Sequence, residues 1–186
     1  MGNHRDWPFG YIDQLLSFGN LLIGLLVIVF LSMHPPAKKA PDTLPPPGSL
    51  AFVTAWPDGP IDVDLWIKSP GDDKPVGYSR KDGKFCALLR DDLGTTNDGS
   101  PFNSENAFCR ALPAGEYIAN LHGYSVPQGI VMVHVEIALN GRLLVSRDLE
   151  LRAKQERTVV RFTLDGQGGL VPGSQSQVFK PLRSAS

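Results

Sequence analysis

The sequence predicts an all-β protein, an antiparallel β-sandwich preceded by a single transmembrane helix and a proline-rich linker. Three observations carry this prediction. Apolar and polar residues alternate over several short segments after residue 50, which is the pattern of half-buried strands. Sixteen prolines and nineteen glycines favour turns and loops over a helical bundle. One stretch near the amino terminus is apolar over about the length needed to cross a bilayer.

The chain therefore divides into five parts. We expect a short N-terminal tail over 1–10, a transmembrane helix over 11–33, a Pro-rich linker over 34–49, a β-sandwich domain over 50–172 and a flexible C-terminal tail over 173–186. A sandwich of this size is large enough to bury a core of its own. The net charge of -1 gives no basic footprint, so nucleic acid is not an expected partner.

Alternating residues place the strands of the predicted sandwich. Residues 61–67, 116–122, 130–139 and 158–164 each put apolar side chains on one face. Between 130–139 and a returning strand over 142–149 lies Asn140-Gly141, the residue pair that a type I′ hairpin turn favours. No amphipathic helix separates these segments. The strands should therefore pair in an antiparallel fashion.

The predicted helix carries one narrow polar stripe on an otherwise apolar surface. Asp13, Ser17, Asn20 and Gly24 recur at helical spacing, and the run from Leu15 to Met33 would rise roughly 28 Å. Polar groups facing lipid cost free energy, so the stripe favours packing against a protein partner. Asp13 is then a candidate proton carrier, or alternatively an interfacial residue at the helix start. A cleaved signal peptide is the competing interpretation, but residues 31–34 form a poor cleavage site.

Residues 8–33 resemble the TolR/ExbD family, the single-helix subunits of ion-driven envelope motors. Pro8, Tyr11-Ile12-Asp13 and the following leucine-rich run carry the resemblance. It implies that Asp13 exchanges protons with a surrounding multi-pass channel-type membrane protein. The spacing of Pro8 to Asp13 and the presence of Asn20 depart from the family's pattern.

Residues 58–125 resemble the bacterial β-sandwich modules of the pre-peptidase and DUF2135-like kind. The resemblance rests on the segments 61–71, IDVDLWIKSPG, and 112–117, LPAGEY. It implies accessory binding or structural support, without catalysis. In the second segment Pro113 and Gly115 should set a tight turn before Tyr117 enters a strand with its ring buried and its hydroxyl available for a partner.

The two cysteines bear on the compartment of the domain. Cys86 and Cys109 could form one disulfide in an oxidising compartment, or remain small buried apolar side chains in a reducing one. Arg5, set against Lys38 and Lys39, weakly favours a cytoplasmic C-terminal domain by the positive-inside rule. The stiff proline-rich linker and the cysteine pair favour the opposite orientation. We expect a bacterial inner membrane protein whose C-terminal domain is periplasmic.

No catalytic constellation or established cofactor motif occurs, so we expect no enzyme activity and no cofactor. Asp62 and Asp64 share one face of a strand and are weak candidates for a calcium site, with further carboxylates from 91–92 or 72–73. Trp56 and Trp66 could stack on sugars or pack in the core, and the histidines show no closed metal spacing.

The function expected from these features is that of an accessory or stator-like subunit of an envelope complex, with an exported β-sandwich and with a second copy of the chain as a further candidate partner. The alternative is a membrane-anchored binding module for a carbohydrate or an envelope protein, in which the helix acts only as an anchor.

Overall fold

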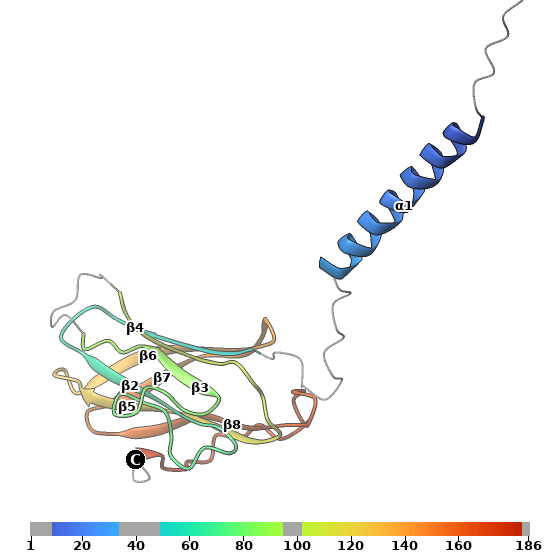
Figure 1. The fold of residues 1–186 in the computed structure, drawn as a ribbon. Coiled ribbons are helices and arrows are strands. Elements are labelled where there is room, and N and C mark those ends of the chain that lie inside the picture. Colours follow the sequence, from blue (N-terminus) through green and yellow to red (C-terminus); the bar gives the residue numbers. More distant parts are fainter. Residues whose placement is uncertain (1–8, 34–48, 95–101, 184–186) are drawn as a thin grey trace, which may run out of the picture. The chain divides into compact units, whose positions relative to one another are not determined.

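The computed structural model describes residues 9–33, 49–94 and 102–183, and the chain divides into two compact units, Met1–Asp42 and Thr43–Ser186. The first unit contains the helix α1 (Phe9–Met33), and the second contains eight strands among its described residues (Figure 1). The predicted tail over 1–10 lies mostly outside the described residues, and so does nearly all of the linker over 34–49.

Helix α1 is 25 residues long, and all of its described side chains, at positions 13–29, are exposed. Asp13, Ser17, Asn20 and Gly24 share one face of it by helical geometry. Within the described part of the chain, no helix combines the length and the hydropathy that crossing a membrane requires. The segment predicted over 11–33 is thus helical, and its assignment as a membrane span has no structural support.

The second unit is a sandwich of two antiparallel sheets, which confirms the predicted all-β class (Figure 1). One sheet has the order β3 (Cys86–Arg90), β4 (Asn103–Cys109), β1 (Leu50–Trp56), β6 (Ile130–Leu139) and β7 (Arg142–Arg152). The other has the order β2 (Asp62–Lys68), β5 (Gly115–Ser125) and β8 (Glu156–Leu164). Every pair of neighbouring strands is antiparallel.

The predicted hairpin joins β6 and β7. Asn140 and Gly141 have φ angles of 51° and 76°, the left-handed values that a type I′ turn needs at both central residues. The Asn140 side chain also accepts a hydrogen bond from the Ser49 amide at 3.0 Å, just before β1 begins. The turn therefore sets the register of β6 with β7 and ties it to the start of β1.

The core lies between the two sheets and is built from the predicted apolar faces. Val131, Val133, Val135 and Ile137 of β6 are all buried. The Tyr117 ring is fully buried and stacks on Phe162 with centroids 5.5 Å apart, and its hydroxyl donates to the Pro113 carbonyl at 3.0 Å. The ring and hydroxyl of Tyr117 therefore behave as the 112–117 segment predicts.

Strand β2 differs from its prediction because both of its faces are buried. Val63 and Leu65 face the core as expected, but Asp62, Asp64 and Trp66 on the opposite face are also at most 8% exposed. The alternation of polar and apolar residues in β2 predicts that the polar face is exposed to solvent. It does not reveal that distant segments of the chain cover that face. This buried acidic strand is where the candidate site lies.

The C-terminal segment 173–186, predicted as a flexible tail, packs against the sandwich over its described part. We call residues 174–183 the C-terminal strap. Ser176 bridges to Arg161 on β8, and Leu182 is only 3% exposed, packed with Trp66 and Ile118. The Leu182 amide donates to the Glu156 carboxylate at 2.8 Å. The strap therefore covers the outer face of the three-stranded sheet.

Cys86 on β3 lies opposite Cys109 on β4, and the two form a disulfide. Both residues are almost fully buried. The structure thus pairs the two cysteines that the sequence offered as a possible bridge.

Candidate functional site

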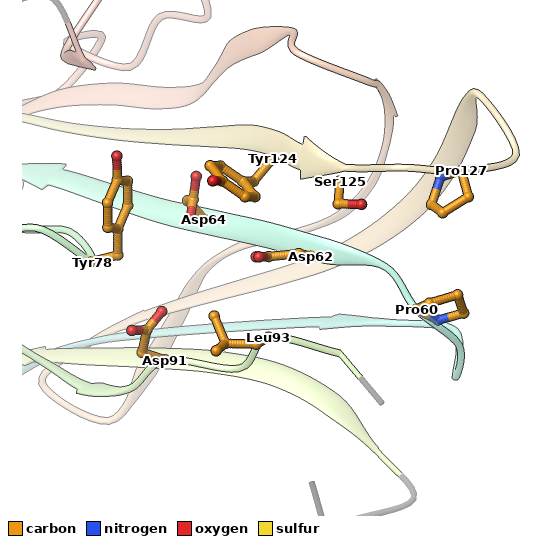
Figure 2. A pocket seen from close by; sticks show the side chains of 9 residues that line it. All are labelled: Pro60, Asp62, Asp64, Tyr78, Asp91, Leu93, Tyr124, Ser125 and Pro127. Carbon is orange, nitrogen blue, oxygen red and sulfur yellow. The ribbon is translucent and has the colours of Figure 1, made fainter. Parts of the chain in front are cut away.

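An open pocket of about 530 Å³ lies beside β2 (Figure 2). Residues of β2, of β5 and of the loops that connect the strands line it. Its volume falls in the range of small-molecule sites, about 300–1,000 Å³. The lining combines three carboxylates, two tyrosines, one serine and three apolar residues: Asp62, Asp64, Asp91, Tyr78, Tyr124, Ser125, Pro60, Leu93 and Pro127. Charged and aromatic groups thus converge on this concave surface.

Two carboxylates come from β2 because its alternation places Asp62 and Asp64 on the face away from the core. Asp64 lies opposite His122 of β5 in the sheet register, and its Oδ2 is 2.8 Å from His122 Nδ1. Asp62 lies at a β-bulge, where the pairing shifts between Asp62 and Val63. Its Oδ1 is buried without a hydrogen-bond partner in the protein.

The histidine beside Asp64 is held in one tautomer by its second partner. Arg183 of the C-terminal strap lies with its Nη1 2.7 Å from His122 Nε2. Because a guanidinium only donates hydrogen bonds, Nε2 must accept, which leaves the proton on Nδ1 to be donated to Asp64. The neutral imidazole therefore orients the Asp64 carboxylate without cancelling its charge.

The third carboxylate, Asp91, follows β3 in a turn that Asp92 organises. The Asp92 carboxylate accepts hydrogen bonds from the Gly94 and Ser104 amides at 3.0 and 2.9 Å, and from Arg90 at 2.8 Å. Gly94 has a φ of 73°, and a Cβ there would lie 2.6 Å from the Ile61 carbonyl oxygen. Only glycine fits this approach of the turn to β2, and the turn brings Asp91 to the pocket.

The tyrosines form an aromatic wall. Tyr78 lies edge-on to Trp66, with centroids 5.3 Å apart, and 6.3 Å from the ring of Tyr124. Gly77 makes this packing possible, since a Cβ at that position would lie 2.5 Å from the Trp66 ring. Figure 2 shows the two tyrosine rings beside Asp64, on the opposite side of the view from Pro60 and Pro127.

Burial and like charge distort the acid–base properties of the site. Burial, together with the charges of Asp64, Asp91 and Asp92, raises the pKa of Asp62 to about 6, and Lys154 partly opposes the rise. Desolvation also raises the pKa of Glu105 on β4 well above its ordinary value. Glu105 is fully buried and accepts the Leu65 amide at 2.6 Å, so it satisfies a backbone donor on the free edge of β2.

The predicted calcium ligands are only partly brought together. Asp62, Asp64 and Asp91 line one pocket, whereas Asp92 is held by its own turn. Asp72 does not line this pocket, and its carboxylate accepts hydrogen bonds from Ser69 and Arg80. No group of three or more potential ligands within the described ranges is arranged to hold a metal ion.

The aromatic candidates change as well. Trp56 and Trp66 are buried, so neither offers a face for stacking on sugars.

His122 and His134 lie in different sheets, His122 on β5 and His134 on β6. His134 is exposed, and its hydrogen bonds to Asp148 and Glu136 raise its pKa.

On the helix, the structure places Asp13, Ser17, Asn20 and Gly24 on an exposed surface. Asp13, Ser17 and Leu21 border a shallow groove along α1. A Cβ added at Gly24 would meet nothing within 4 Å. The proton-coupling and helix-packing roles predicted for these residues stay predictions.

Sequence reasoning missed the two tyrosines that line the pocket, and it missed His122 and Glu105 as buried partners of β2. Tyr124 and His122 continue the polar face of the predicted strand over 116–122, which was a usable signal. The sequence contained no comparable signal for Tyr78 and Glu105, because their segments were not predicted to lie beside β2.

The fold and site define the class of protein: a two-sheet antiparallel β-sandwich with an acidic, aromatic pocket beside an edge strand. Comparison with family models, curated proteins and solved structures gave no match to this chain. The two resemblances drawn from the sequence therefore stay predictions.

Proposed function

We propose that this chain is a non-enzymatic binding module, tethered at a bacterial membrane, whose ligand occupies the pocket between Tyr78 and Tyr124. The single observation that carries the proposal is the pocket itself. It is large enough for a small ligand, and it places two aromatic rings and three carboxylates around one space. Residues from β2, β5 and four connecting loops converge there.

The surroundings of the pocket favour binding over catalysis. His122 donates a hydrogen bond from Nδ1 to Asp64 and accepts one from Arg183 at Nε2. Both ring nitrogens are therefore engaged, and neither is free to act as a general base. The pocket residues also include no cysteine or lysine nucleophile. A rigid site built on a strand pair suits recognition of a ligand.

The tether is supported by the apolar run from Leu15 to Met33, which lies wholly within α1. Its described large apolar side chains are between 45% and 69% exposed, so the helix needs apolar surroundings from outside this chain's described residues. Sedimentation with membranes after carbonate washing, lost when residues 1–48 are removed, is the expected result. Recovery of the intact chain in the soluble fraction would contradict the tether.

The binding proposal is tested by screening the full chain in detergent against a mixed library of cationic, neutral and anionic fragments by ligand-observed NMR. We expect hits that Tyr124→Ala abolishes. The control Val178→Ala, at an exposed position on the C-terminal strap, should leave them unchanged. A library without any hit sensitive to Tyr124→Ala would contradict the assignment of the pocket.

A second candidate function is the stator-like subunit of an envelope complex. The observation that favours it is the stripe of Asp13, Ser17, Asn20 and Gly24 on a helix whose other described residues are mostly apolar. Asn20→Leu should then abolish co-purification with a multi-pass channel-type partner, and Asp13→Asn should abolish ion-driven function while leaving that association intact. Unchanged behaviour of both variants would leave the helix as an anchor only.

A further inference from the structure

We propose that the pocket binds an organic cation, an alkylammonium group, with Asp62 as its anionic anchor and Tyr78 and Tyr124 as its aromatic walls. This inference rests on the proposed binding function and names the chemistry of its ligand. It is argued from the charge balance of the carboxylates, from the properties of the aromatic wall and from the shape of the lining.

The charge balance singles out Asp62. Asp91 pairs with Lys81 at 2.9 Å, and Asp64 is hydrogen-bonded by His122. Asp62 is only 8% exposed, and its buried Oδ1 has no hydrogen-bond partner within the protein. A buried carboxylate short of a hydrogen-bond partner is costly, so the Asp62 side chain, which lines the pocket, is suited to a donor that arrives with a ligand.

Figure 2 shows Asp62 and Asp91 extending from opposite sides toward the space that they border. Asp91 is paired with Lys81, whereas the negative charges of Asp62 and Asp64 are not cancelled by the neutral His122, and Lys154 offsets that of Asp62 only in part. A neutral sugar would satisfy the hydrogen bonds of these carboxylates but leave the like charges uncompensated. A cation would satisfy both, and it is therefore the favoured ligand.

The aromatic wall distinguishes an organic cation from a metal ion. Within the described residues, no group of three ligands is arranged for a metal, and two tyrosines line the pocket beside the carboxylates where a calcium site would need further hard oxygen ligands. The Lys154 ammonium already lies 4.5 Å from the centroid of the Tyr124 ring. That distance lies within the range of a cation–π interaction, so an ammonium group is a chemically suitable neighbour for this ring.

The rest of the lining fits the carbon chain of such a ligand. Pro60, Leu93 and Pro127 contribute apolar surface, and the pocket, at about 530 Å³, is much larger than an ammonium group alone. An alkyl chain of several carbons would lie on these residues while its ammonium head reaches Asp62. A lysine side chain and a free diamine share this chemistry.

Protonation of Asp62 should control binding. The pKa of this carboxyl is about 6, set by burial and by Asp64, Asp91 and Asp92 against Lys154, so it is ionised at neutral pH and largely neutral at pH 5. An alkylammonium should therefore bind more tightly at pH 7.5 than at pH 5. The bound cation in turn favours the ionised form of Asp62, so binding near pH 6 should release protons.

The test uses the full chain in detergent and three probes of equal chain length: n-pentylammonium, n-pentanol and n-pentanoate. Calorimetry at pH 7.5 should show binding of pentylammonium alone. Asp62→Asn and Tyr124→Ala should each weaken it by about tenfold or more. The matched control Asp73→Asn removes an exposed carboxylate outside the pocket lining and should leave the affinity unchanged.

Two further probes separate the sources of the ammonium group. Tighter binding of N-acetyl-lysine methylamide than of 1,5-diaminopentane would indicate a protein side chain, and the reverse order a free diamine. Binding of pentanol equal to that of pentylammonium would overturn the cation inference while leaving the pocket a binding site. Binding of Ca²⁺ that depends on Asp62, without binding of pentylammonium, would also overturn it. Failure of every probe and of the mixed library would overturn the proposed function as well.

Discussion

The ionised form of Asp62 should favour ligand binding but lower the stability of the folded protein. Its pKa is raised to about 6 in the folded protein, whereas an unfolded Asp titrates near 3.9. The folded state therefore binds more protons between these values, and stability falls as the pH rises through that window. Above about pH 6 the ionised carboxylate destabilises the fold.

Asp62→Asn should consequently stabilise the protein at pH 7, by on the order of 1 kcal/mol once solvent in the open pocket is allowed for. The melting temperature should rise by about 3 °C. Thermal unfolding at pH 7 and at pH 5 measures this, and the gain should shrink at the lower pH. Asp73→Asn is the control, and a lower melting temperature of Asp62→Asn at pH 7 would contradict the argument.

Glu105 is a second buried acid, but its role is structural. Desolvation raises its pKa well above the ordinary value, and it accepts the Leu65 amide at 2.6 Å. Glu105→Gln keeps an acceptor of the same shape and should preserve the fold. Glu105→Ala leaves the amide unsatisfied and a cavity behind, which should cost about 3 kcal/mol.

The pH dependence separates these two variants of Glu105. Because the raised pKa belongs to the folded state, the wild type should lose stability as the pH rises and the buried carboxyl ionises. Glu105→Gln should show less of this loss in chemical denaturation measured from about pH 4 upward, because the difference begins above the ordinary glutamate pKa of about 4.3. Parallel profiles for the wild type and Glu105→Gln would refute an uncharged Glu105 in the native protein.

Among the elements, the β3–β4 pair depends on its disulfide. Cys86 and Cys109 are 23 residues apart in sequence, so their bond closes a loop that contains Asp91 and Leu93 of the pocket. By the chain-entropy estimate, this closure contributes about 3 kcal/mol. The double variant Cys86→Ala/Cys109→Ala should therefore melt roughly 10 °C lower than the oxidised wild type.

A reductant supplies the control for the disulfide prediction. It should lower the melting temperature of the wild type toward that of the double variant and leave the variant unchanged. Equal melting temperatures for the oxidised wild type and the double variant would show that the bond does not stabilise the sandwich.

The C-terminal strap is the other element whose contribution can be isolated. Leu182 is 3% exposed and packs on Trp66 and Ile118, whereas Val178 on the same strap is 67% exposed. Leu182→Ala should destabilise the sandwich by about 2–3 kcal/mol, and Val178→Ala by less than about 0.5 kcal/mol. Urea unfolding measures both, and similar losses in the two variants would contradict the packing of the strap.

At the scale of the whole molecule, the alternation of apolar and polar residues predicted the strands that have one buried and one solvent-exposed face. Strand β6 alternates strictly, and Asn140-Gly141 specifies its turn through local backbone preferences, so both follow from nearby residues. Strand β2 shows the limit of such reasoning. Asp62 and Asp64 indicated a solvated face, yet both are buried, in a pocket that the distant Tyr78, Asp91 and Tyr124 also line.

The candidate site could not be predicted as a unit for the same reason. Its carboxylates come from β2 and from the turn after β3, and its rings come from residues 78 and 124. The contacts that join these segments depend on strand order across two sheets, which local patterns do not specify. Asp64 and His122, for example, are 58 positions apart and meet through the β2–β5 register.

The disulfide also carries a prediction about where the whole molecule resides. Such bonds persist in oxidising compartments, so the pairing of Cys86 with Cys109 favours export of the sandwich over the cytoplasmic orientation that the flanking lysines suggest. Both cysteines are nearly inaccessible in the folded protein, so labelling must follow unfolding. Cells expressing the full chain would be quenched in acid, denatured, and alkylated with a maleimide of known mass.

We expect no adduct on the trapped chain and two adducts after prior reduction, since the sequence contains two cysteines. The double alanine variant, which should carry none under either condition, is the control. Two adducts without reduction would mean that the sandwich is held in a reducing compartment. In that case the orientation with an exported domain would be wrong. The ammonium proposal would still be open to its own test, because Asp62, Tyr78 and Tyr124 lie outside the loop that the disulfide closes.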